Sequence, residues 1–319
     1  AIVSEFRMQF LAQRLEALLA AFEAARIKTL LLKGAALACT VYPGFAQRPM
    51  SDVDLLVEPG RAEEAWRLAL TLGWAPVYGD QVSPIYEGHH HLAPLRDATG
   101  IDVGLELHTG ILPPAHPFKL EVGALWRDAL FARVGRTPAL VPSHLHRILH
   151  LCAHFAWSHA LREGAWRTFR DIHAIVTHES PDWDSVVESA RRTRMTTCCY
   201  WTFRLAGAAS GVKVPDEVLR ALSPRLPAFA LRRLERYFLT MITPPPHWDQ
   251  PTRRLRHLLW VAGIQPRLSG HGGVRPWSRN HLFAELVHGE GHEDAPEDDA
   301  PNPWIRRAQQ LMREVAVLT

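Results

Sequence analysis

Two aspartates, Asp52 and Asp54, stand one residue apart in the segment "DVDLLV", which otherwise has the apolar composition of a buried strand. Alternate residues of a strand share a face, so both carboxylates would project in the same direction. Buried carboxylates are costly unless they are paired, hydrogen-bonded or bound to a metal. Oxygen ligands suit Mg²⁺, which usually keeps substrate phosphates as further ligands. The pair therefore predicts a site where Mg²⁺ could orient a triphosphate and activate a hydroxyl.

A third carboxylate is expected from a neighbouring strand. Glu106, in "LELH", lies between Leu105 and Leu107 and is an isolated acid in an apolar segment. Asp102 shares the face of Glu106 by period-two counting and is the alternative. The sequence thus predicts three acids on two strands, with Glu106 as the preferred third member.

The segment "LLLKGAAL" offers a place for phosphates. A short apolar strand is followed by a Lys-Gly turn and the start of a helix, where free backbone N–H groups and the helix dipole favour anions. Gly34 permits the tight turn, and Lys33 adds a positive charge. Arg48 precedes the aspartates and could hold a phosphate with its guanidinium fork.

The elements that must position these residues alternate over the first ~115 residues, a length close to that of an ordinary domain. Apolar spacing predicts a helix over residues 3–26 and another after Pro59. Strands are expected at 30–32, in "DVDLLV" and in "GIDVGLELHTGI", and a short helix should follow Gly34. This alternation predicts an α/β or α+β sheet domain.

The pattern changes to helices from about residue 122, among them "SHLHRILHLCAHFAWSHAL", "AWRTFRDIHAIVTH" and "AFALRRLERYFLTMI". We therefore divide the chain into a sheet domain, residues 1–121, and a helical domain, residues 122–286. The acidic, proline-rich residues 287–302 are expected to be a flexible segment. Residues 303–319 are expected to form a terminal helix.

The arrangement "LLLKGAAL…RPMSDVDLLV…ELH" resembles the polymerase-beta-type nucleotidyltransferase superfamily. It is most similar to a bacterial branch known only as uncharacterised nucleotidyltransferase family proteins. The resemblance implies an α+β fold with a small mixed sheet, followed by an all-helical C-terminal domain that closes over it. It also implies transfer of a nucleoside monophosphate from an NTP to an acceptor hydroxyl, with release of pyrophosphate.

By the same resemblance, Asp52 and Asp54 match the metal-binding pair and Glu106 matches the third acid. Gly34 matches the glycine of the superfamily's Gly-Ser turn, and Ser51 lies inside the aspartate motif with Arg48 ahead of it. The expected cofactor is Mg²⁺ or Mn²⁺, with ATP as the first choice of NTP.

Two departures from the superfamily pattern leave alternatives open. Ala35 stands where a serine is usual, and the stretch from Gly34 to Asp52 is longer than usual. A catalytically inactive nucleotide-binding or regulatory protein would fit these departures. A phosphotransferase on the same fold and an interaction module built on the helical half are further alternatives.

Histidines occur in two groups. Because adjacent side chains on a strand diverge, we interpret His89, His90 and His91 as part of a polar loop beside the active-site sheet, not as a metal site. His146, His150 and His154 share one helix face and are expected to line the interdomain cleft or to pack as neutral rings.

Four further residues are candidates for acceptor or interdomain contacts: His108, His150, His154 and Asp171. Asp171 lies mid-helix among apolar neighbours, and its first expected role is an ion pair with an arginine or a histidine.

Composition narrows the partners. The formal net charge of +3 is low, and the arginines are spread along the chain, which argues against a long nucleic acid as substrate. No apolar run has the ~18 residues of a membrane span. The four cysteines fit no zinc or disulfide spacing, so we expect free thiols in the cytoplasm. The acceptor is open among a small molecule, a peptide, a protein and the end of an RNA.

Overall fold

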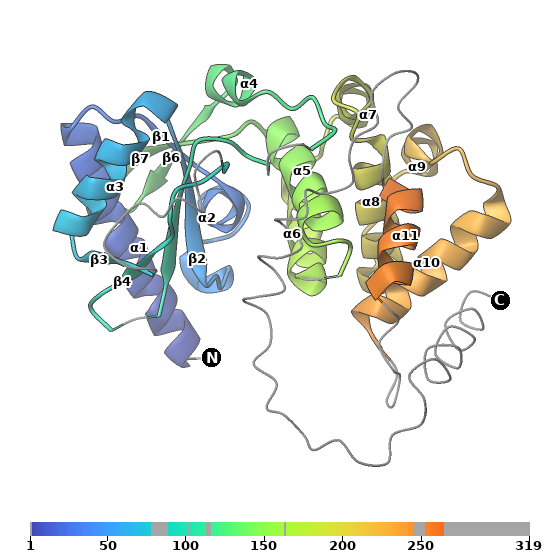
Figure 1. The fold of residues 1–319 in the computed structure, drawn as a ribbon, viewed down its shortest axis with the longest axis horizontal. Coiled ribbons are helices and arrows are strands. Elements are labelled where there is room, and N and C mark those ends of the chain that lie inside the picture. Colours follow the sequence, from blue (N-terminus) through green and yellow to red (C-terminus); the bar gives the residue numbers. More distant parts are fainter. Residues whose placement is uncertain are drawn as a thin grey trace, which may run out of the picture.

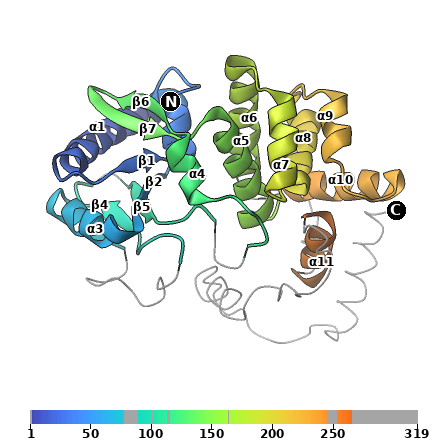
Figure 2. The ribbon, with the colours of Figure 1, turned by 90° about the horizontal axis from the view of Figure 1, so that it is seen from above.

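The computed structural model describes residues 2–77, 89–100, 102–112, 116–162, 164–244 and 253–264. It combines a small mixed sheet with many helices, so the fold is α+β as expected. Figures 1 and 2 both show the strands together with α1 and α3 on one side and the helices from α5 to α10 on the other. The stretches 287–302 and 303–319 lie outside the described residues.

The five-stranded sheet has the order β1-β2-β5-β4-β3. Strands β2 and β5 are parallel neighbours, and the other pairs are antiparallel. The expected strands are present, whereas the short β3 and β4 were not predicted. The strand bounds are β1 Thr29–Leu31, β2 Asp52–Val57, β3 Trp74–Pro76, β4 Leu95–Asp97 and β5 Gly104–His108.

The two faces of the central strands β2 and β5 pack against different parts of the molecule. Val53, Leu55, Leu105 and Leu107 are buried in one core with α1 (Ile2–Ala24) and α3 (Ala62–Thr71). Leu56, on the opposite face of β2, belongs to the core of the helical part. Since side chains alternate along a strand, the acids of β2 and β5 lie on the face turned toward the helical part.

A second, two-stranded sheet lies within the range that the sequence assigned to the helical domain. After α4 (Val122–Arg127), strands β6 (Leu130–Val134) and β7 (Thr137–Val141) form an antiparallel hairpin. Val134, Ala139 and Val141 pack in the same core as α1. By its packing, this hairpin therefore extends the N-terminal body to about residue 141.

The helical part is built around large apolar side chains, with Phe155, Phe169 and Trp201 fully buried. The Trp201 indole N–H donates to the carbonyl of Gly263 at 3.0 Å, so the last described helix closes over α8. The residues from Trp183 to Ser210 form two helices separated at residues 193–195, where Arg194 has a φ of 63°. The bounds are α5 His144–Ala153, a π-helical turn His154–Ser158, α6 Ala165–Glu179, α7 Trp183–Arg192, α8 Thr196–Ser210, α9 Asp216–Leu222, α10 Ala228–Ile242 and α11 Arg253–Ile264.

Candidate active site

The register of β2 and β5 brings the predicted acids to one place. Asp54 lies directly opposite Glu106, and Asp52 lies opposite Gly104 on the same face. A Cβ atom added to Gly104 would lie 3.4 Å from the Cβ of Asp52, so the glycine leaves space beside that carboxylate. Asp102, the alternative third acid, is exposed and precedes β5. The strand geometry therefore groups Glu106, not Asp102, with the aspartates.

Asp54 is the centre of a buried ionic cluster. Its Oδ1 accepts a hydrogen bond from Lys33 Nζ at 2.7 Å and lies 2.9 Å from His108 Nε2. The same Nε2 lies 3.3 Å from Glu106 Oε2. Because a carboxylate can only accept, His108 Nε2 carries a proton and is shared by the two acids. Lys33 and His108 thus tie the start of α2 (Lys33–Ala38), β2 and β5 together around one oxygen atom.

The charges of this cluster are strongly coupled. Burial raises the pKa of Asp54, but Lys33 and His108 outweigh it and hold the pKa well below its usual range. Burial lowers the pKa of Lys33, but Asp54, Glu106 and Asp52 together raise it above its ordinary value. Asp52 differs, because burial and the charges of Asp54 and Glu106 raise its pKa. Negative charge is therefore in excess around Asp52.

This donor set can be tested against a metal ion. The ligand atoms of Asp54, Glu106 and His108 all lie within 4.8 Å of one another. The carboxylate oxygens of Asp52, Asp54 and Glu106 are the hard ligands that Mg²⁺ or Mn²⁺ prefers. His108 Nε2 is already used as a hydrogen-bond donor to the acids. The oxygen atoms therefore fit a hard divalent ion, and His108 fits a role in orienting them.

The Lys-Gly turn is built differently from the expectation. The left-handed residue is Lys33, with a φ of 44°, whereas Gly34 lies inside the short helix α2 (Lys33–Ala38). A Cβ on Gly34 would lie 3.4 Å from the Arg48 guanidinium, so the glycine leaves room for that side chain. Ala35 is 1% exposed and packs in the core with α1. A serine hydroxyl at this position would therefore lie in the apolar core.

Arg48, predicted to hold a phosphate, is engaged elsewhere. Its Nε and Nη2 donate to the two carboxylate oxygens of Asp171, each at 2.7 Å. Tyr42 also donates its hydroxyl to Asp171 Oδ1 at 2.7 Å. The expected ion pair of Asp171 with an arginine is thus present, and it joins the loop before β2 to helix α6. We call these three residues the Arg48–Asp171 latch.

The family model described as "Uncharacterised nucleotidyltransferase" matches residues 3–211. The chain belongs to this family. No curated protein and no solved structure matches the chain. Among the described residues, no helix combines the length and the apolar character that crossing a membrane requires. The family match includes the sheet, the latch and helices α5 to α8.

The remaining predicted site residues are Ser51, which directly precedes β2, and the histidines His150 and His154 of the helical part. Ser51 is exposed and donates its hydroxyl to Asp52 Oδ1 at 3.0 Å. His150 is 3% exposed, and burial together with the positive charge of Lys33 lowers its pKa to about 3. Burial and the charge of Lys33 also hold the pKa of His154 far below its ordinary value. Both rings are therefore neutral and lie near the ionic cluster, as the helix-face argument predicts.

His89, His90 and His91 lie in a loop beside the sheet, as predicted, but their side chains do not diverge. His89 and His90 lie in a bend, and His91 makes only an isolated bridge to His108. The three rings therefore gather, with centroids 4.3 to 4.8 Å apart. Burial lowers the pKa of His90 and of His91. The sequence predicted the loop but not the gathering of its rings, because only the divergent side chains of a strand were considered.

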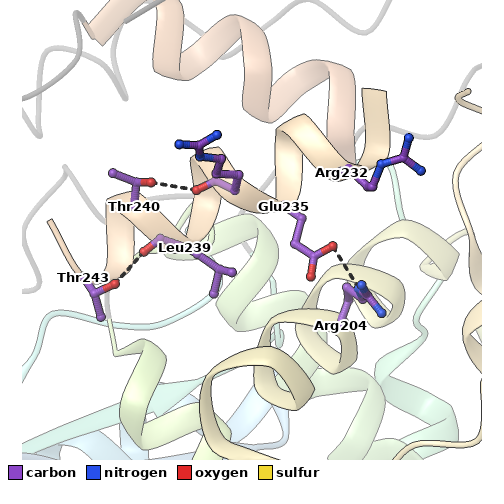
Figure 3. A pocket seen from close by; sticks show the side chains of 7 residues that line it. Arg204, Arg232, Glu235, Leu239, Thr240 and Thr243 are labelled. Carbon is purple, nitrogen blue, oxygen red and sulfur yellow. Dashed lines mark hydrogen bonds and ion pairs between the residues drawn. The ribbon is translucent and has the colours of Figure 1, made fainter. Parts of the chain in front are cut away.

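A surface hollow on the helical part is shown in Figure 3, where Arg204 pairs with Glu235 at 3.0 Å. Arg232 and Thr240 also line it, and its lining residues come from α8, from α10 and from Thr243 directly after α10. None of the predicted site residues contributes to it. We therefore place the candidate active site at the carboxylates of β2 and β5.

Proposed function

We propose that the protein is a metal-dependent nucleotidyltransferase of the polymerase-beta type. It moves the nucleoside monophosphate of an NTP to an acceptor hydroxyl and releases pyrophosphate. The observation that carries the proposal is the in-register pairing of Asp54 with Glu106, with Asp52 on the same face. This arrangement supports a three-carboxylate site, and the family match supports nucleotidyl transfer as the class of reaction.

Asp52, Asp54 and Glu106 would hold Mg²⁺ or Mn²⁺. When bound, the metal would supply positive charge that stabilises the triphosphate and its leaving group. Lys33 would bind the outer phosphates, since its ammonium group is close to the acids and has three donors. His108 would orient Asp54 and Glu106 through the shared Nε2 proton.

In the transfer step, the acceptor oxygen forms a bond to the α-phosphorus while the bond to the β-phosphate oxygen breaks. The acceptor loses its proton, and Glu106 is the best-placed base because its side chain is 27% exposed, against 4% for Asp54. His150 and His154 lie on the helical side of the acids and would contact the acceptor. That acceptor is a small molecule, a peptide or a protein, and ATP is the first NTP to test.

The proposal is tested by a screen of labelled NTPs with Mg²⁺ or Mn²⁺, using the protein alone and with a lysate as the source of acceptors. We expect labelled product and pyrophosphate. Asp54→Asn and Glu106→Gln should each lower the rate by about 10²–10³-fold, the size typical of losing one electrostatic stabiliser. Asp102→Asn is the matched control, because this acid is exposed and precedes the same strand. Equal rates for Asp54→Asn and the wild type would overturn the assignment.

A non-catalytic nucleotide-binding protein is the second candidate. It is favoured by Ala35, which is buried in the core, and by Arg48, which is engaged with Asp171 and not with the acids. Calorimetry separates the two: NTP binding that needs Asp54 but gives no turnover with any acceptor supports the second candidate. A phosphotransferase would instead release a nucleoside diphosphate, which product chromatography distinguishes from pyrophosphate.

A further inference from the structure

The histidines at positions 89–91 have the geometry of a ligand set. One ligand atom from each of the three rings lies within 4.8 Å of the other two. Zn–N bonds of about 2.0–2.1 Å in a tetrahedral site place the nitrogens ~3.4 Å apart, so only a modest closure of the rings is needed. Side-chain rotations in a bend supply such a closure more easily than those of a packed strand.

The ring nitrogens are arranged in a way that suits a metal. His91 Nδ1 lies 2.8 Å from the backbone carbonyl of Leu92, and because a carbonyl only accepts, Nδ1 carries the proton. The lone pair of His91 is therefore on Nε2. A backbone carbonyl that accepts from the second ring nitrogen is the usual support for a metal-binding histidine. His90 Nδ1 is buried and has no hydrogen-bond partner among the described residues.

The backbone fixes this segment against the end of β5. The N–H groups of Thr109 and Gly110 donate to the carbonyl of His90 at 2.9 and 3.0 Å, and Leu92 N–H donates to Leu107. A Cβ on Gly110 would lie 3.3 Å from the Cβ of His90, so only a glycine permits this close approach without a shift. The segment is thus held as a defined structure with its rings gathered on one side.

We propose that His89, His90 and His91 form a binding site for a nitrogen-preferring divalent ion of the zinc class. Three imidazoles match the preference of Zn²⁺, Co²⁺ or Ni²⁺, whereas Mg²⁺ prefers oxygen. This site is separate from the carboxylate site and does not depend on the proposed transfer reaction. The ion would fasten the segment to β5, where the His108 ring lies 5.4 Å from His90 and 5.2 Å from His91.

The charges around the rings act in both directions. Glu106 raises the pKa of His91, whereas Lys33 and His108 lower the pKa of both His90 and His91. The proximity of the three rings and the hydrogen bond of His91 therefore carry the proposal, not a surplus of negative charge. An ion held there would also stabilise β5, the strand that carries Glu106 and His108.

The test uses the full chain without a histidine tag, loaded with Zn²⁺ and dialysed against buffer containing excess Mg²⁺. We expect a single Zn²⁺ ion to be retained, measured by atomic emission. X-ray absorption on the wild type should show a first shell rich in imidazole nitrogen at about 2.0–2.1 Å. A first shell dominated by oxygen with one imidazole would assign the ion to Asp54, Glu106 and His108 instead, and would overturn the proposal.

Variants locate the ion independently of activity. His90→Gln and His91→Gln should each lower the affinity for Zn²⁺ at least about tenfold. His173→Gln is the matched control, since this histidine is exposed on α6, and Asp54→Asn should also retain the ion. Circular dichroism checks that each variant is folded. Retention of the ion by both His90→Gln and His91→Gln, or no retention by the wild type, would overturn the proposal.

Discussion

Two of the buried ionic clusters in the described part of the chain have similar contact distances but differ in their balance of charge. In the Arg48–Asp171 latch, one guanidinium donates two hydrogen bonds of 2.7 Å to one carboxylate. The Tyr42 hydroxyl donates a third hydrogen bond to the same carboxylate. In the site on β2 and β5, Lys33 and His108 share one oxygen of Asp54. Asp52 and Glu106 remain beside it with few donors of their own.

The difference separates a cluster whose charges are balanced from one with surplus carboxylate charge. Asp171 is 1% exposed and its partners satisfy both of its oxygens. Around Asp54, three acids face two positive groups, and the Glu106 side chain is partly open to solvent. A closed pair stabilises the contact between the sheet and α6, whereas surplus carboxylate oxygens can bind a cation. Burial alone would not have distinguished them.

The largest effect on stability is expected at the latch. Asp171→Ala leaves the Arg48 guanidinium buried without a counter-charge and should lower the free energy of unfolding by about 3–5 kcal/mol. Urea denaturation measures the change. The double variant Arg48→Met with Asp171→Leu should recover part of the loss, because no unpaired charge remains.

The control for this prediction is an exposed pair. Lys28 and Glu58 lie 3.9 Å apart, and the Lys28 side chain is 73% exposed. Glu58→Gln should change the free energy of unfolding by less than about 1 kcal/mol. If Asp171→Ala were as mild as Glu58→Gln, the latch would contribute no more than a surface contact.

A smaller effect of opposite sign is expected at the site. Asp52→Asn should raise the free energy of unfolding by about 0.5–2 kcal/mol in EDTA at neutral pH, because it removes a carboxylate that burial, Asp54 and Glu106 disfavour. The same change should lower nucleotidyl transfer. A variant that is more stable but transfers more slowly would show that the Asp52 charge destabilises the fold and is needed for the reaction.

The pH dependence follows from the raised pKa of Asp52. Because the folded-state pKa lies above the unfolded value of ~3.9, the ionised carboxylate destabilises the fold, and this penalty grows as pH rises through the interval between the two values. The advantage of Asp52→Asn should therefore disappear below about pH 4, where both forms are neutral. An advantage that persists at low pH would show that charge is not its cause.

The smallest effect on stability is expected at Gly104. The methyl group of Gly104→Ala would lie at van der Waals distance from the Cβ of Asp52, so the free energy of unfolding should change by less than about 1 kcal/mol. Transfer should fall about tenfold or more, because the space beside Asp52 is partly filled. Gly60→Ala is the control, since nothing lies within 4 Å of its added Cβ. Unchanged transfer in Gly104→Ala would show that this space is not used.

Sequence reasoning placed the carboxylates well, because strand periodicity determines which side chains share a face. The strand containing Asp52 and Asp54 is present as predicted, and so is the strand containing Glu106. The helices α1, α5, α6, α9, α10 and α11 also follow the apolar spacing. Periodicity does not predict which residue a long side chain contacts.

Arg48 illustrates that limit, because its partner Asp171 is 123 residues away and on another element. Lys33, not Gly34, adopts the left-handed conformation, a choice that depends on how α2 packs. The hairpin β6–β7 was missed because its packing with α1 is a long-range contact. The histidines at 89–91 lie in the predicted loop, but the gathering of their rings was not predicted, because a bend, unlike a strand, lets neighbouring side chains converge.

The bond between Trp201 and Gly263 has a practical meaning for anyone preparing a shorter version of the protein. The family match stops at residue 211, yet Trp201 on α8 depends on α11 for its indole partner, and Trp260 donates to the carbonyl of Ala156 at 2.7 Å. A fragment trimmed at the family boundary would expose these aromatic surfaces and invite aggregation. Expression of the sheet with its helical partner should therefore extend to at least Ile264.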